Sequence, residues 1–113
     1  MRDLVSLLGE AVGLGASDLH LVAGMSPIIR LNGDIASMPG EPIPADEVRR
    51  MLLDVLTETQ RARLEEEWEL DFALQVDPLG RFRGNAHYSR GALEAAFRYI
   101  PEEIPDLAAL GHR

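Results

Sequence analysis

Apolar residues in the first third of the chain recur at helical spacing and then alternate with polar ones. The helical spacing predicts a helix over residues 2–13, which Gly13 and Gly15 end. Alternation over residues 17–23 and an apolar run over residues 28–31 predict two strands. Because Asn32-Gly33 has the composition of a type I′ turn, the second strand is expected to return as a third over residues 34–38.

The middle of the chain returns to helical spacing, and the last third alternates again. An apolar stripe between residues 48 and 56 predicts a second helix, and Thr57 to Gln60 has the spacing of a capping box that starts a third, ending near Glu67. Period-two patterns then predict strands over residues 68–76, 81–88 and 92–100, and a short helix is expected near residues 106–110. The order α-βββ-αα-βββ has no βαβ repeat, so we expect an α+β fold, an antiparallel sheet with helices on one side.

Composition and charge narrow the function classes. At 113 residues the chain has room for one domain, and a net charge of −8 argues against a general nucleic-acid binder, since phosphate neutralisation needs clustered cations. All its basic side chains other than histidine are arginines, and it has no cysteine. We see neither a signal peptide nor a run of about 18 apolar residues, so we expect a cytoplasmic protein without membrane insertion.

Few residues offer chemistry of their own. Asp18 and His20 share one face of a predicted strand, but no third or fourth ligand is in reach, so we expect no metal site and interpret them as hydrogen-bonding neighbouring strand or turn groups. Glu69 and Asp71 lack the apolar surroundings that would separate the pKa values of a catalytic carboxylate pair. A P-loop of the form GxxxxGK[ST] is impossible without lysine. We therefore expect the chain alone not to be an enzyme.

The arginines of the last two strands are the most informative polar residues. Arg81 and Arg83 lie on one strand face, together with Asn85 and His87, and a turn near Arg90-Gly91 would return Arg98 beside Arg83. Converging guanidinium groups repel each other unless carboxylates or a bound anion offset their charge. Two interpretations stay open here: an arginine–carboxylate ladder using Glu94, Asp71 or Glu69, or a phosphate site.

Three segments carry a resemblance to a known family. GASDLHLVAGMSPIIRLNGDI, LTETQRARLEEEWELDFAL and GRFRGNAHYSRGALEAAFRYIP resemble, in that order, segments of the type IV pilus retraction ATPases, the PilT family of twitching-motility motors. The resemblance implies a PAS-like amino-terminal domain with a six-stranded antiparallel sheet and flanking helices. It also implies a hexameric motor whose ATP and Mg site lies in a RecA-like domain that this sequence lacks. We therefore assign residues 1–105 to the PAS-like domain and 106–113 to the start of the linker.

The same resemblance suggests roles for individual residues. Arg83 and Arg98 match arginines that approach the nucleotide phosphates, whereas Arg90 and Arg81 are weaker candidates. Asp18-Leu19-His20 becomes scaffold and subunit-interface material. Gly84 stands where the family usually has valine, which would remove a packed side chain and loosen the strand.

The expected partners are the RecA-like domains of the same and neighbouring subunits, and the pilus machinery at the cytoplasmic face of the inner membrane. Two alternatives remain. The domain could belong to a pilus extension or type II secretion ATPase, although the short lead before the first strand favours the retraction type. It could also be a free-standing PAS-like sensing or protein-interaction module, which predicts an apolar pocket between sheet and helices with inward polar groups.

Overall fold

The computed structural model describes residues 3–101, which form three helices and six strands in the predicted order. The elements are α1 (Leu4–Gly13), β1 (Asp18–Leu21), β2 (Ile28–Leu31), β3 (Asp34–Ser37), α2 (Ala45–Val55), α3 (Glu58–Glu67), β4 (Glu69–Val76), β5 (Gly80–Ser89) and β6 (Ala92–Pro101). The helix expected near residues 106–110 and the assigned linker lie outside the described residues.

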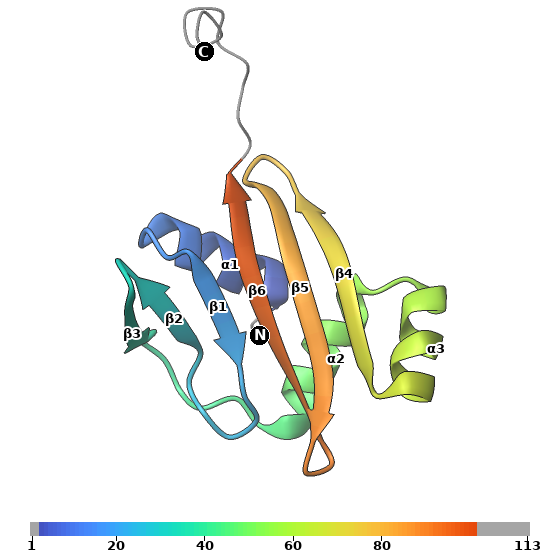
Figure 1. Ribbon diagram of the computed structural model, residues 1–113. Helices are drawn as coiled ribbons and strands as arrows, with labels where there is room; N and C mark the ends of the chain where they lie inside the picture. The colour runs from blue at the N-terminus through green and yellow to red at the C-terminus, as the bar shows by residue number, and fades with distance from the viewer. Residues whose placement is uncertain (1–2, 102–113) are drawn as a thin grey trace, which may run out of the picture.

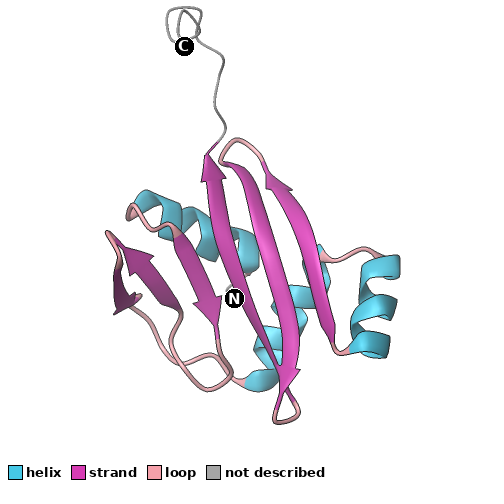
Figure 2. Ribbon diagram, viewed as in Figure 1, coloured by secondary structure: helices cyan, strands magenta, loops and turns pink. Residues whose placement is uncertain are grey.

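All six strands belong to one antiparallel sheet in the order β3-β2-β1-β6-β5-β4. Its centre is the β1–β6 pair, which joins the first and the last strand of the chain. Figure 1 shows α1 and α2 behind this sheet and α3 beside the β4 edge, whereas the front face carries no helix. The same layering is plain when helices and strands are coloured separately (Figure 2). The predicted α+β fold with its six-stranded antiparallel sheet is thereby confirmed.

The core lies between the sheet and the two helices behind it. The leucines of α1 that recur at helical spacing, Leu4, Leu7 and Leu8, are all buried, as are Leu19 of β1 and Phe97 of β6. Each such side chain contributes about 1.5–3 kcal/mol when it leaves water. The helices thus cover the apolar face of the central strands, and the polar face of these strands points away from the helices.

Turns and caps follow the sequence closely. Asn32 and Gly33 both have positive φ, 51° and 87°, as the β2–β3 hairpin requires. The capping box of α3 is present in full, because Thr57 accepts from the backbone of Gln60 while the Gln60 side chain accepts from the backbone of Thr57. Some boundaries differ from the prediction. The fourth strand begins one residue later, because Trp68 follows α3 in the left-handed conformation, and the first strand spans Asp18–Leu21 instead of residues 17–23.

Within residues 3–101, none of the helices is both long enough and apolar enough to span a membrane.

Candidate functional site

The helix-free face of the sheet holds a shallow groove of about 680 Å³. Its floor includes small side chains, Ala73 on β4 and Ala96 on β6, which leave the longer polar side chains standing around it. The lining residues are Asp18, His20, Asp71, Phe72, Ala73, Arg83, Gly84, Asn85, Ala96, Phe97, Arg98 and Ile100. Arg83 and Arg98, the two arginines singled out in the sequence, both belong to this groove.

The β5–β6 turn places these two arginines opposite each other. Arg90 and Gly91 have φ values of 54° and 81°, so the turn is a two-residue type I′ connection between Ser89 and Ala92. Counting back along the ladder from this turn brings Arg83 directly opposite Arg98. A slip by one residue would move the arginines of one strand to the helix side, where they would disrupt the core.

The pairing continues across the sheet as a row of charged residues. Arg98 on β6 lies opposite Asp18 on β1, and Asp18 lies opposite Arg30 on β2. The row therefore reads Arg30, Asp18, Arg98, Arg83 over four neighbouring strands, with three positive charges and one negative. An excess of two positive charges gathers here, although the chain as a whole carries −8.

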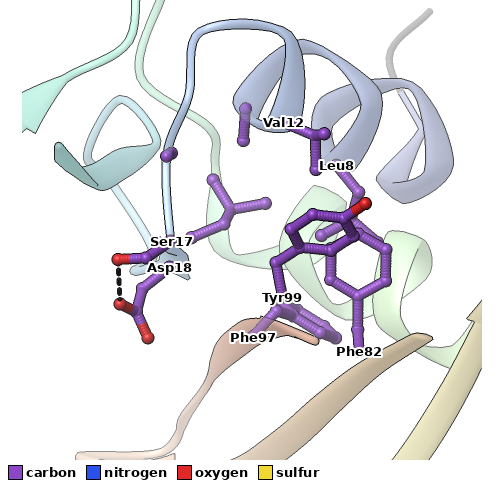
Figure 3. Close-up of a pocket in the computed structure, with 10 residues that line it drawn as sticks. Leu8, Val12, Ser17, Asp18, Phe82, Phe97 and Tyr99 are labelled. Carbon is purple, nitrogen blue, oxygen red and sulfur yellow. Dashed lines mark hydrogen bonds between the residues drawn. The ribbon is translucent and has the colours of Figure 1, made fainter. Parts of the chain in front are cut away.

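Asp18 is the centre of this row. One carboxylate oxygen accepts from Arg98 Nε at 3.2 Å, and the other accepts from Ser17 Oγ at 2.7 Å and lies 3.7 Å from Arg30 Nε. Figure 3 shows the Ser17 hydrogen bond, with the carboxylate pointing away from the aromatic cluster beneath α1. Partial burial raises the pKa of Asp18, but the hydrogen bonds from Ser17 and Arg98 and the charges of Arg98 and Arg30 outweigh this and leave it below its usual value.

Arg83 has no such partner. Within residues 3–101 no hydrogen bond or ion pair engages its side chain, and Arg98 directly across the strand is also positive. Like charges placed opposite each other destabilise a strand pair. Since Asp18 binds Arg98 at Nε, the terminal amino groups of Arg98 have no partner among the described residues either. The pair can therefore accept an anion with several oxygens, such as a phosphate or a carboxylate.

The carboxylates expected to form a ladder with these arginines lie elsewhere. Glu94 is 3.4 Å from His87 Nε2, Asp71 accepts from Asn85 Nδ2 at 2.8 Å, and Glu69 lies opposite His87. None of the three is paired with Arg83 or Arg98. The partner of Arg98 is Asp18. The alternation of β1 predicts that Asp18 lies on the helix-free face, but its pairing with Arg98 depends on β1 lying beside β6 in the sheet.

The structure does not bring Arg90 into this site. Arg90 forms part of the β5–β6 turn, seven residues along from Arg83, which corresponds to roughly 23 Å of extended chain. Arg81, the other weaker candidate, lies on the same face as Arg83 but does not line the groove. Among the arginines predicted from the sequence, the groove therefore contains Arg83 and Arg98.

The space beside Gly84 of β5, expected to be empty from the sequence, is filled by the ring of Phe72. The Phe72 ring lies over it on the helix side, and a Cβ atom built on Gly84 would come within 2.6 Å of that ring. Phe72 in turn makes an edge-to-face contact with Phe97, with ring centroids 5.9 Å apart. The missing side chain is thus replaced by an aromatic ring that packs β4, β5 and β6 together beneath the arginine pair.

The space between the sheet and α1 is nearly filled. The small cavity there measures about 10 Å³ and is lined by apolar side chains that include Leu8, Phe82 and Tyr99 (Figure 3). This is about the space of one water molecule. Among the described residues, this cavity is smaller than the apolar ligand pocket that a PAS-like sensing module would need. Within residues 3–101, no three His, Asp or Glu side chains gather as metal ligands.

Comparison with known proteins relates the chain to pilus motors. No family model matches it. It is 37% identical over 109 residues to the type IV pilus retraction ATPase PilT of Pseudomonas aeruginosa, an alignment that covers 96% of this chain and 32% of PilT. It is 35% identical to the type IV pilus ATPase PilU of the same organism, over 96% of this chain and 28% of PilU. A twitching motility protein of Neisseria gonorrhoeae is 32% identical to this chain, over 96% of this chain and 29% of the length of that protein.

Solved structures give the same relationship. A crystal structure of the pilus retraction motor PilT with bound ADP matches with a TM-score of 0.87 and 37% identity, covering 96% of this chain and 32% of that one. The ATPase DotB of Legionella pneumophila, at 20% identity and a TM-score of 0.73, shares the fold over 100% of this chain and 33% of its own. The chain spans about a third of the length of these relatives. It is therefore a homologue of the type IV pilus retraction ATPases of the PilT family and corresponds to their amino-terminal domain.

Proposed function

We propose that this chain is the assembly and nucleotide-cleft domain of a hexameric pilus retraction ATPase, and that Arg83 and Arg98 contact the phosphates of ATP. The observation that carries the proposal is the unpartnered Arg83 directly opposite Arg98, in a groove on the one face of the sheet without a helix. The identity of 37% to PilT supports a retraction motor rather than an extension or secretion motor.

The residues of this chain determine which part of ATP hydrolysis it could contribute. It has no lysine and thus no P-loop, so ATP hydrolysis would depend on a RecA-like domain outside residues 1–113, where Mg²⁺ would accompany the nucleotide. This chain would contribute only its arginines. Guanidinium groups fork onto phosphate oxygens and neutralise the charge that develops as the terminal phosphoryl group is transferred. Arg90 lies at the β5–β6 turn and outside the groove, so the proposed phosphate contacts rest on Arg83 and Arg98.

The partners and the location follow from the same assignment. We infer that the helix-free face of the sheet lies against RecA-like domains of the same or a neighbouring subunit, so that relative movement of the two domains opens and closes the arginine pair on the phosphates. The motor would act in the cytoplasm on the pilus machinery at the inner membrane. Residues 1–105 would form the domain, and residues 106–113 the start of the linker.

The proposal predicts the behaviour of two arginine variants of the full-length protein. Arg83→Ala and Arg98→Ala should each lower the rate of ATP hydrolysis by roughly 10²-fold or more, because each removes a charge from the transition state. Arg63→Ala is the matched control, since Arg63 is an exposed arginine on α3 whose ion-pair partner is Glu67. The measurement is steady-state hydrolysis at saturating ATP, with the thermal unfolding temperature of each variant recorded alongside. Wild-type rates in both groove variants would contradict the proposed phosphate contacts and show that these arginines only cover the exposed face of the sheet.

The sequence that follows Arg113 in the gene offers a second test. A further strand followed by GxxxxGK[ST] would supply the domain that the proposal requires. A stop codon directly after Arg113 would contradict the ATPase assignment for this protein.

A further inference from the structure

We propose that Asp18 is a positioning residue for the anion site: its carboxylate holds Arg98 by the Nε edge and so presents the terminal amino groups of Arg98 to a phosphate. This inference rests on the proposed function of Arg83 and Arg98 and assigns a role to the carboxylate beneath them.

The contacts of Asp18 favour such a role. Its side chain is only 11% exposed, and both of its oxygens are occupied, one by Arg98 Nε and the other by Ser17 Oγ with Arg30 Nε nearby. It therefore offers little to an outside partner. It also approaches both arginines at Nε, the inner nitrogen of the guanidinium group. The outer edge of the Arg98 guanidinium, which carries two amino groups, stays available.

Arg98 needs an anchor of this kind. Its side chain is 73% exposed, and Asp18 is the acceptor that holds it within residues 3–101. An unheld arginine has a large rotamer freedom, which binding of a phosphate would remove at a cost in affinity. Because Asp18 and Arg98 are also directly opposite in the ladder, the anchor is fixed by the β1–β6 pairing and not by a flexible loop.

Asp18 also has an opposing effect, since its negative charge repels a bound phosphate. The two effects predict opposite results when Asp18 is replaced. Loss of the anchor weakens phosphate binding, whereas loss of the charge strengthens it. The proposal states that the anchor dominates, because the hydrogen bond to Nε is direct while the repulsion acts across the guanidinium group and is screened by salt.

The test is a set of variants of the full-length protein titrated with inorganic triphosphate, with affinity measured by calorimetry. Asp18→Ala should weaken binding about 3- to 10-fold, the loss expected for one preset hydrogen bond. Asp18→Asn keeps an oxygen that accepts from Arg98 Nε and should lose less. In an Arg98→Ala background the anchor has no partner, so Asp18→Ala should cause no further loss of affinity, and only the small gain from the removed negative charge should remain.

The possible results distinguish the positioning role of Asp18 from the proposed phosphate contacts of Arg83 and Arg98. Unchanged or tighter binding by Asp18→Ala would overturn the positioning role while Arg98→Ala still weakens binding. An equal loss from Asp18→Ala in both backgrounds would also overturn it, because a general effect on the fold does not depend on Arg98. If Asp18→Ala does not fold, Asp18→Asn and Asp18→Ser take its place in the same comparison. Wild-type affinity in Arg98→Ala would instead reject the proposed function, and the role of Asp18 with it.

Discussion

At the scale of single residues, the helix-free face of the sheet is organised by one carboxylate and one glycine. Asp18 joins β2, β1 and β6 through Arg30 and Arg98, and Gly84 lets the Phe72 ring close over β5 on the opposite side. One residue governs how the arginines are held, and the other governs how the strands beneath them pack. Each makes a prediction that stability measurements can check.

Asp18 should make the stability of the fold depend on pH in the acid range. Its folded-state pKa lies below the unfolded value of about 3.9, so the native state favours the ionised carboxylate. Its contribution is therefore fully present above the unfolded pKa and is lost as the pH falls through the folded pKa. We expect the difference in free energy of unfolding between the wild type and Asp18→Asn to be largest near neutral pH and to shrink below about pH 4. A difference independent of pH, measured by urea unfolding, would contradict the ion pairs described here.

Gly84 should not tolerate a larger side chain such as valine. A Cβ atom at this position overlaps the Phe72 ring, so we expect Gly84→Ala to lower the free energy of unfolding by about 1–3 kcal/mol, and Gly84→Val by more. Gly13→Ala is the matched control: nothing lies within 4 Å of a Cβ atom on Gly13, near the end of α1, and alanine favours a helix.

The double variant Gly84→Val/Phe72→Leu tests whether overlap with the Phe72 ring is the reason that a side chain at position 84 destabilises the fold. A smaller side chain at Phe72 makes room for valine, so the two substitutions together should cost less than the sum of their separate effects. Additive losses in urea unfolding would show that the Phe72 ring is not what excludes a side chain at Gly84.

At the scale of the elements, α3 buries fewer side chains than α1 or α2. Leu64 is its one buried side chain, and the helix lies beside the sheet edge and not behind the sheet. The Tyr88 hydroxyl of β5 donates to Glu65 of α3 and accepts from Arg49 of α2, which ties the two helices to the sheet. Burial of Tyr88 and its hydrogen bond to Glu65 raise the pKa of the Tyr88 hydroxyl above its usual value.

Because α3 buries so little, it should depend strongly on its cap. Thr57→Ala removes the side-chain half of the capping box and should lower the free energy of unfolding by about 1 kcal/mol. Thr59→Ala is the matched control, since Thr59 is exposed within the helix. Amide hydrogen exchange should show faster opening over residues 58–67 in the Thr57 variant alone. Equal exchange in both variants would contradict the importance of the cap.

The sequence predicted these elements well because their causes are local. The helix of residues 58–67 follows from its own capping box, and the β2–β3 hairpin follows from Asn32-Gly33. The alternation of β5 and the turn at Arg90-Gly91 also predicted Arg83 beside Arg98. The pairing of Asp18 with Arg98 was missed because these residues are 80 positions apart and meet through the β1–β6 ladder. The packing of Phe72 over Gly84 was missed for the same reason, since it depends on cross-strand neighbours.

At the scale of the whole molecule, one face of the sheet is covered by helices and the other carries none. The helices cover the apolar side, where the cavity lined by Leu8, Phe82 and Tyr99 measures about 10 Å³. The other side carries the groove and, across it, the row of Arg30, Asp18, Arg98 and Arg83, which by itself has two more positive than negative charges. In the proposed function, this is the face over which a second domain would close on an anion.

The most direct measurement is the structure of the full-length protein with a non-hydrolysable ATP analogue and Mg²⁺. We expect guanidinium nitrogens of Arg83 and Arg98 to lie within hydrogen-bond distance, about 2.7–3.2 Å, of phosphate oxygens in at least one closed subunit interface. We also expect that Asp18 still accepts from Arg98 Nε in that state. Arginines that remain turned to solvent in every nucleotide-bound interface would contradict the central claim.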